Sequence, residues 1–406
     1  MSDADVIIVG GGPAGVAAAV ELRRAGIPRV MLLDREPELG GATRHCSHSP
    51  FGMREFGRVY LGAAYGRRLT AEAARAGVEV RTGHSVVRLQ PGGRLDIATP
   101  DGIGTLDASR ILIATGARER PRSSRLISGD RPVGVVTTGT LQAYVAFHGL
   151  MPFTRPLIIG SELVSLSAVL TCIGHGARPV ALAESCPQPL ARAPFAWFPR
   201  LAGVPFRLGT DLVDIRGAGR VEAATLRHAD GRREEVACDG VLLTGRFTPE
   251  SALFLQSPLG VDRGSAGPAV DQEGRTRDPF CFAAGNLLRA VETGGWSFRE
   301  GRAIGRALVR DLLGAPCAEA PVAVSFDEPI KLVVPSLIRP GVREPALADF
   351  QLRVTRAVRG RLVLEIDGGE VWWARKLFLP ERRILVPIPT SAFAASSIHF
   401  RLSEEG

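Results

Sequence analysis

The N-terminal part of the chain alternates short apolar runs with a glycine turn and an alanine-rich stretch. Residues 6–9 form an unbroken apolar run, which suits a strand buried on both faces. Residues 17–22 predict a helix, and residues 30–33 predict a second strand that ends at Asp34. This order predicts a βαβ unit at the start of the chain.

The same pattern returns in the middle of the chain. Gly10 and Asp34 are 24 positions apart, and so are Gly160 and Glu184. An apolar strand again precedes the glycine, and a helix, a glycine turn and a strand at 180–183 follow it. The equal spacing predicts an internal repeat of the first unit.

From about residue 321 the pattern changes to short, partly alternating runs that glycines and prolines divide. Such runs predict a small β-domain of several strands, with a sandwich among its possible arrangements. Trp372 and Trp373 are adjacent, so they point to opposite faces of one strand. One should join the core; whether the other marks an interface or packs at an edge stays open.

Length and composition favour a globular protein of two or three domains. The chain has 406 residues, 45% of them hydrophobic and 23% charged. The net charge of +8 comes from scattered arginines, and we expect no nucleic-acid partner. Since the apolar runs are too short to span a bilayer, we expect a cytoplasmic protein, with peripheral membrane association left open.

The cysteines lack the spacing of a redox or metal site. None of the six forms a C-x-x-C pair, so we expect reduced thiols, no adjacent redox disulfide and no metal.

The glycines of the first unit carry its chemistry. Gly10, Gly12 and Gly15 complete a G-x-G-x-x-G: the first permits a tight turn, the second a close approach of a pyrophosphate, and the third helix–strand packing. The N–H groups of the following helix face the phosphates, and Asp34 is placed to bind ribose hydroxyls. The unit therefore predicts a dinucleotide site.

Three later segments resemble those of flavoproteins with two dinucleotide-binding domains: "LGG" at 39–41, "ILIATGARERP" at 111–121 and "RTRDPFCFAAGN" at 275–286. Asn286 stands where that family usually has Asp, and its amide can still bond a ribityl hydroxyl. The resemblance implies an α/β fold with two Rossmann-like domains, as in glutathione and thioredoxin reductases. The small all-β C-terminal domain is added to this fold by the residue pattern, and that segment shows no family resemblance.

The resemblance also implies domain boundaries and FAD contacts. The first part of the FAD domain would span residues 1–118, and an NAD(P)-binding-like domain would span 119–247. The second part of the FAD domain would span 248–318, and the β-rich domain 319–406. The implied FAD-binding residues are Gly10, Gly12, Pro13, Ala14, Gly15, Asp34, Arg35, Gly41, Thr43, Arg44, Val86, Ala114, Thr115, Gly116, Gly285, Asn286 and Trp296.

The repeated unit has lost two of its three glycines. Glu162 and Ser165 stand at the second and third positions, and a glutamate there adds bulk and charge beside a pyrophosphate. We interpret this domain as a retained scaffold without a nicotinamide site. A role of Glu162 in binding a ribose or a substrate is the alternative.

Residues 40–69 descend toward the isoalloxazine ring in this architecture and contain candidate catalytic groups. These are His45, Cys46 and His48; a cysteine beside His and Arg could have a depressed pKa. Purely structural hydrogen bonding is the alternative role.

A narrower resemblance concerns the kind of enzyme. "RHCSHSPFG", "GVVTTGTLQAY" (134–144) and "GGWSFREGRAIGRAL" (294–308) resemble FAD subunits of opine oxidases, hydrogen cyanide synthase, heteromeric proline or hydroxyproline dehydrogenases and glycerol-3-phosphate dehydrogenase-like proteins. This implies the flavoprotein subunit of a heteromeric dehydrogenase or oxidase for an amino acid, an opine or a related small metabolite.

The resemblance implies partners as well. Electrons would pass to a partner subunit or a quinone, and the partners would be a small [2Fe–2S] protein and a second flavoprotein subunit. Only Cys317 lies beyond residue 300, so a cluster would need another chain. The alternatives are a self-sufficient NAD(P)H-dependent FAD oxidoreductase and a non-catalytic, FAD-containing assembly subunit.

Overall fold

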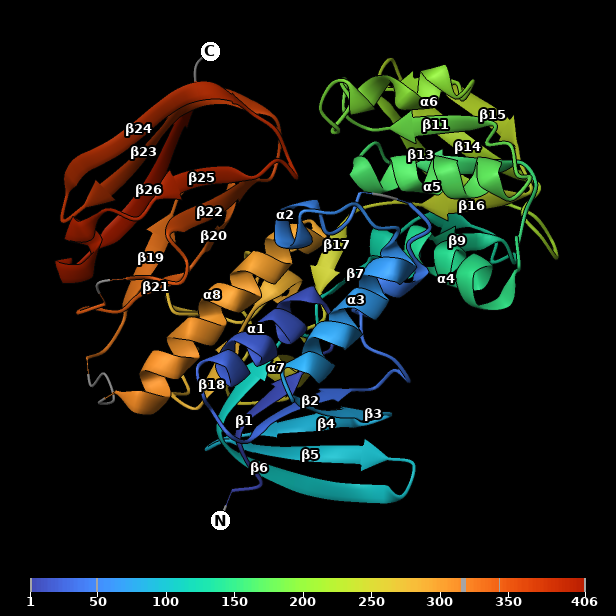
Figure 1. Cartoon of the computed structure of the whole chain (residues 1–406). Helices are drawn as coiled ribbons and strands as arrows, with labels where there is room; N and C mark the ends of the chain where they lie inside the picture. The colour runs from blue at the N-terminus through green and yellow to red at the C-terminus, as the bar shows by residue number, and fades with distance from the viewer. Residues whose placement is uncertain (1, 49, 315–318, 343, 405–406) are drawn as a thin grey trace.

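The computed structural model describes residues 2–48, 50–314, 319–342 and 344–404 (Figure 1). Residues 315–318 lie outside the described ranges. They include Cys317 and the last residue before the expected domain boundary at 318/319.

The N-terminal sheet is built around β1 (Ala4–Val9), which is parallel to β2 (Val30–Asp34) and β6 (Gly102–Ile113). The apolar runs predicted from the sequence are these strands, and β1 is almost wholly buried because layers cover both faces. The other strands of this sheet are β3 (Glu79–Thr82), β4 (Ser85–Gln90), β5 (Arg94–Thr99) and β18 (Cys281–Ala283). Because β18 pairs with β6, residues late in the chain return to the first nucleotide unit.

Helices α1 (Pro13–Arg24), α3 (Gly62–Arg75) and α8 (Gly294–Leu313) lie side by side across this sheet (Figure 1). Small residues let α1 and α8 approach closely: a Cβ at Gly301 would lie 2.0 Å from the Ala14 carbonyl oxygen. The first turn of α8 therefore extends past the N-terminus of α1.

The middle of the chain forms a second parallel sheet around β10 (Pro156–Ile159), with β11 (Ala181–Glu184) and β16 (Gly240–Leu243) beside it. Helix α5 (Leu163–Gly174) connects β10 to β11, as α1 connects β1 to β2. The remaining elements of this region are β9 (Val135–Thr137), β12 (Phe206–Leu208), α4 (Thr138–His148), α6 (Phe198–Leu201), β8 (Ser128–Gly129), β13 (Thr210–Arg216), β14 (Ala223–His228) and β15 (Arg233–Ala237). Two dinucleotide-binding folds are thus present, as the repeat predicts.

A short ribbon lies where the chain passes between these two regions. In it, β7 (Ala117–Glu119) pairs antiparallel with β17 (Phe247–Pro249). The short helices outside the second region are α2 (Met53–Phe56) and α7 (Ala252–Leu255).

The C-terminal region is all β, as its alternating pattern predicts. One sheet has the order β21-β19-β26-β23-β24 and the other β20-β22-β25. Their bounds are β19 (Val322–Phe326), β20 (Ile330–Val334), β21 (Leu337–Ile338), β22 (Asp349–Val354), β23 (Val358–Ile366), β24 (Gly369–Phe378), β25 (Ile384–Pro387) and β26 (Ile398–Glu404). Trp372 packs against the core and Trp373 is 58% exposed on the edge strand β24, which confirms the opposite-face prediction.

The C-terminal region packs on the first one through buried polar contacts. Gln351 of β22 accepts a hydrogen bond from Nε of Arg289 at 2.8 Å, and Arg339 donates to Asp271 at 2.9 Å. The first of these contacts brings β22 close to the segment that precedes α8.

Candidate functional site

The first glycine turn leaves an open cradle at the N-terminus of α1. A Cβ at Gly10 would lie 2.5 Å from the Ala114 carbonyl oxygen, and one at Gly15 would lie 2.0 Å from the Gly10 carbonyl oxygen. Among the described residues, a Cβ at Gly12 would meet nothing within 4 Å, and no side chain caps the N–H groups that follow it. Free helix N–H groups beside open space fit a dinucleotide pyrophosphate.

The segment after β2 lies directly on this turn. The Gly40 N–H donates to the Gly11 carbonyl at 2.8 Å, and a Cβ at Gly41 would lie 3.1 Å from the Gly12 Cα. Thr43 is buried and donates to the Gly40 carbonyl at 2.7 Å. Arg44 donates to Glu36, and its buried Nε lies 3.9 Å from Glu38 but makes no hydrogen bond among the described residues.

Asp34 is buried at the end of β2 and bonds the turn. Its carboxylate accepts from the Gly11 N–H at 2.7 Å and from the Glu36 N–H at 2.9 Å. Burial raises the pKa of Asp34 above its ordinary value. Arg35 beside it is exposed, and Val86 lies on β4; contact of these residues with FAD stays a prediction.

The loop after β6 forms another wall of the cradle. The Ala114 N–H donates to the Val9 carbonyl at 2.8 Å, and the Thr115 hydroxyl donates to the Glu250 carbonyl at 2.8 Å. Gly116 has a φ of +79° and open space where a Cβ would point. A larger side chain here would fill that space.

Gly285 and Asn286 follow β18 and face the start of α1. A Cβ at Gly285 would lie 2.8 Å from the Ala14 Cβ, and the Gly285 N–H donates to Glu300 at 2.8 Å. Asn286 clamps the backbone of Glu292: its Nδ2 donates to the Glu292 carbonyl, and its Oδ1 accepts from the Glu292 N–H. An amide can do both, whereas a carboxylate has no donor.

Trp296 lies in the first turn of α8. That turn packs against the start of α1 and against Phe51, since a Cβ at Gly294 would lie 3.9 Å from Pro13 and 3.5 Å from the Phe51 ring. The indole Nε1 of Trp296 is buried without a hydrogen-bond partner among the described residues. The predicted FAD residues therefore converge around the N-terminus of α1. They come from the first glycine turn, from the loops after β6 and β18, and from the first turn of α8.

His45, Cys46 and His48 lie on and after the short helix Gly41–His45, against α4. The Cys46 thiol lies 3.3 Å from the Ala42 carbonyl and 3.7 Å from the Gln142 side chain. The expectation of a depressed cysteine pKa is wrong: burial, and then Glu119, raise the pKa of Cys46 to about 12. Burial, and then Arg44, lower the pKa of His45 below its ordinary value. The His48 ring packs on the Phe51 ring, with 5.1 Å between the ring centroids. A catalytic role of His45, Cys46 and His48 stays a prediction.

The second glycine turn is filled where the first is open. Glu162 occupies the position equivalent to Gly12, and its Oε2 accepts from the Thr244 hydroxyl at 3.2 Å. A Cβ at Gly245, in the loop after β16, would lie 2.0 Å from Glu162 Oε1. Burial, and then Glu184 and Glu381, raise the pKa of Glu162 to about 7.

The other polar contacts of the first turn persist in the second. Ser161, at the position of Gly11, donates to Glu184 at 2.5 Å as the Gly11 N–H donates to Asp34. The Ser165 hydroxyl donates to the Glu162 carbonyl at 2.6 Å. The turn keeps its geometry, and Glu162 fills the phosphate position.

Several charged residues at the site escape prediction from the sequence. Arg289 and Glu300 are buried and paired with each other, and Glu292 receives two further arginines from the C-terminal region. Glu300 lies beside Ser297, Gly301 and Ile304 on the buried face of α8. A charged residue among the apolar and small residues of a predicted helix face is the sequence feature that could have indicated this buried ion pair.

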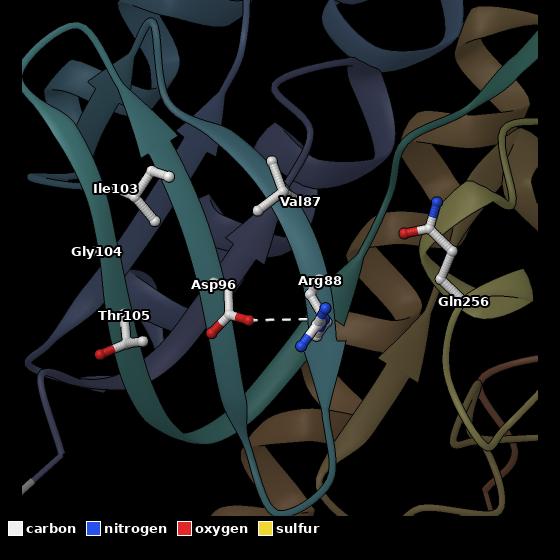
Figure 2. Close-up of a pocket in the computed structure, with 7 residues that line it drawn as sticks. All are labelled: Val87, Arg88, Asp96, Ile103, Gly104, Thr105 and Gln256. Carbon is white, nitrogen blue, oxygen red and sulfur yellow. Dashed lines mark ion pairs between the residues drawn. The ribbon is translucent and has the colours of Figure 1, made fainter.

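A separate pocket lies on the strands β4, β5 and β6 (Figure 2). Its lining includes Val87, Gln256 and the Arg88–Asp96 ion pair at 3.8 Å. The predicted FAD-binding residues do not line it, and we assign it no role.

Within the ranges that the structure describes, no helix combines the length and apolar character needed to cross a membrane.

Comparisons with known proteins agree with this geometry. A model of the pyridine nucleotide-disulphide oxidoreductase family matches residues 4–301. The alpha subunit of sarcosine oxidase from Rhizobium meliloti (strain 1021) is 29% identical over 378 residues, covering 86% of this chain and 34% of that protein. An opine oxidase subunit of the same organism is 31% identical over 188 residues, covering 46% and 39%. The chain thus spans less than half the length of these two relatives.

The crystal structure of thioredoxin reductase from T. acidophilum has the same fold, with a TM-score of 0.64 at 23% sequence identity. The match covers 77% of this chain and 100% of the thioredoxin reductase chain. The family model ends at residue 301, so the C-terminal sheets lie beyond it.

Proposed function

Because the chain belongs to the pyridine nucleotide-disulphide oxidoreductase family, a family of flavin-dependent oxidoreductases, we propose that it is an FAD-binding subunit of a heteromeric dehydrogenase or oxidase. FAD, when bound, supplies the redox chemistry. The substrate would be an amino acid, an opine or a related small metabolite. The electrons would pass to a partner subunit or a quinone rather than come from a bound nicotinamide.

The contrast between the two turns carries this proposal. Gly12 and Gly116 leave space for a pyrophosphate, whereas Glu162 covers Gly245 in the second copy. A nucleotide entering the second turn would have to displace a carboxylate that is bonded to Thr244. The chain thus retains one cradle that fits a dinucleotide.

The FAD assignment rests on the convergence of the implied contact residues. Gly41 lies on Gly12, Gly285 lies on Ala14, and Pro13 lies beside the first turn of α8. The residues would hold the pyrophosphate with helix N–H groups and place the ring near Trp296 and the segment from His45 to Phe51.

The partner assignment rests on the relatives. Two of them are named as subunits of oxidases, and the present chain spans only part of their length. We propose a small [2Fe–2S] protein and a second flavoprotein subunit as partners of this chain.

The test is purification of the chain with its bound partners, followed by anaerobic mixing of the FAD-loaded protein with NADH or NADPH. We expect stoichiometric FAD, no rapid bleaching by either nucleotide, and bleaching by the substrate once the partners are present. Rapid reduction by NADH or NADPH alone would overturn the electron route, and absence of FAD would overturn the cofactor assignment.

A further inference from the structure

A cluster of guanidinium groups joins the C-terminal sheets to the first turn of α8. Arg353 of β22 and Arg383, just before β25, each donate a 2.6 Å bond to Glu292, one to each carboxylate oxygen. The Arg353 side chain is only 2% exposed, and that of Arg383 is 27% exposed. Two arginines from the β-rich region thus share one acidic partner.

The charges in this cluster do not balance. Buried Arg289 pairs with Glu300, and exposed Arg299 lies 4.8 Å from the centre of the Trp296 ring. With Arg353 and Arg383, four guanidinium groups therefore face the two carboxylates of Glu292 and Glu300 among the described residues.

The surrounding acids do not remove this excess. The Lys331–Glu381 pair nearby adds no net charge. Burial raises the pKa of Asp349, and the field of Arg383 opposes that rise, so this carboxylate offsets at most one of the two extra charges. At least one positive charge of the cluster stays uncompensated by the described residues. The buried Arg289 and Arg353 are paired with Glu300 and Glu292, so the excess positive charge lies on the more exposed Arg383 and Arg299, where it attracts an anionic ligand.

Unpaired donors accompany the excess charge. Nε of Arg353 is buried and makes no hydrogen bond among the described residues, and the same holds for Trp296 Nε1. Arg383 stacks on that indole ring, with its guanidinium carbon 3.6 Å from the ring centre. A buried donor without a partner costs free energy unless a ligand supplies the acceptor.

The cluster is tied to the residues that we assign to the flavin. Asn286 holds both backbone groups of Glu292, and the Gly285 N–H donates to Glu300. A ligand bound by Arg353 and Arg383 would therefore lie beside the flavin-facing turn of α8.

We propose that Arg353 and Arg383 form an anion site that binds the carboxylate group of a small organic acid next to the flavin. This inference rests on the proposed function and adds to it the substrate feature that the chain recognises. Arg383 provides the accessible guanidinium, Arg353 and Trp296 provide the unpaired N–H donors, and Glu292 holds the two arginines in place. The C-terminal β region then contributes to ligand binding rather than to stability alone.

The test uses FAD-loaded full-length protein titrated with sodium propionate and, in parallel, with propionamide, which has the same shape and no charge. Ionic strength is held constant with chloride, and binding is followed by the flavin spectrum and by calorimetry. We expect saturable binding of propionate and none of propionamide.

Two single substitutions locate the site. Arg383→Gln should weaken propionate binding by roughly tenfold or more, because it removes a charge-assisted hydrogen bond. Arg382→Gln is the matched control: it removes an adjacent arginine, whose Nε donates to the Leu190 carbonyl, and should leave binding within about twofold. Thermal unfolding checks that both variants are folded.

Absence of saturable propionate binding in both readouts, or wild-type binding by Arg383→Gln, overturns the inference. Equal binding of propionamide does the same, because the site would then not recognise charge. If the purified protein takes up no FAD, the proposed function fails, and calorimetry on the apoprotein still decides the anion site.

Discussion

The carboxylate of Glu162 lies across the second glycine turn and covers Gly245. Its Oε2 accepts a hydrogen bond from Thr244 at 3.2 Å, and a Cβ at Gly245 would lie 2.0 Å from its Oε1. In the first turn a Cβ at Gly12 or at Gly116 would meet nothing within 4 Å among the described residues. The two copies therefore share a backbone plan and differ at the place where a pyrophosphate would bind.

Removing the Glu162 side chain should restore nucleotide access. We expect the double variant Glu162→Gly, Ser165→Gly to gain anaerobic flavin reduction by NADH or NADPH of roughly tenfold or more over wild type, because bulk and charge both leave the phosphate position. Stopped-flow absorbance of the flavin measures this. Ser165→Gly alone is the matched control and should stay at the wild-type rate.

The same residue predicts a pH dependence of stability. Its pKa is about 7 in the folded protein, against an ordinary glutamate value of 4.5, so between these values the native state binds more protons than the unfolded state. Stability should therefore fall as pH rises from about 4.5 to about 7, by at most about 3 kcal/mol from this group. Thermal unfolding of Glu162→Gln, which keeps the shape without the charge, should show a gain over wild type near pH 8 that is several times smaller near pH 5. An equal gain at both pH values would contradict this account.

Gly12 offers a way to separate cofactor binding from folding. Its φ of −75° suits any residue, and a Cβ would meet nothing within 4 Å. Gly12→Val should fold with a nearly unchanged melting temperature in the apoprotein, yet lose roughly tenfold or more in FAD affinity, because the side chain enters the pyrophosphate space.

The control for this variant is the neighbouring glycine of the same motif. Gly10 has a φ of +110°, and its Cβ would strike the Ala114 carbonyl, so Gly10→Ala should lower the yield of folded protein. Full FAD occupancy in Gly12→Val, measured by absorbance of the purified protein, would argue against the first turn as the cofactor site.

The parts of the site that could be predicted from the sequence are those set by local spacing. The glycines of the first turn, the repeat from Gly160 to Glu184 and the opposite faces of Trp372 and Trp373 each depend on neighbours along the chain. The contacts of Arg353 and Arg383 with Glu292 join residues 61 and 91 positions apart. Periodicity indicates that residues 349–354 form a strand, but it does not indicate which surface that strand covers.

Cys46 shows the same limit for chemistry. Its sequence neighbours suggest an activated thiol, whereas its pKa is set by burial and by Glu119, which β7 brings from elsewhere in the chain. We expect iodoacetamide at about pH 8 to label Cys46 in the native protein at least about tenfold more slowly than in the unfolded protein, since the thiolate is the nucleophile. Mass spectrometry of digested samples measures this, and rapid native labelling would restore Cys46 as a reactive group.

The two hydrogen bonds of Asn286 require an amide at this position, where the flavoproteins that the chain resembles usually have a carboxylate. The side chain donates to the Glu292 carbonyl at 3.1 Å and accepts from the Glu292 N–H at 2.7 Å. Asn286→Asp keeps the acceptor and loses the donor, and it adds a negative charge beside the residue that holds Arg353 and Arg383. We expect a loss of about 1–3 kcal/mol in stability, because the partly buried carbonyl is left unpaired. Denaturant titration of the apoprotein measures this. Asn286→Ala removes both hydrogen bonds and adds no charge, so it separates the lost hydrogen bond from the added carboxylate. A loss in Asn286→Ala at least as large as in Asn286→Asp would assign the effect to the bonds, and a loss confined to Asn286→Asp would assign it to the charge.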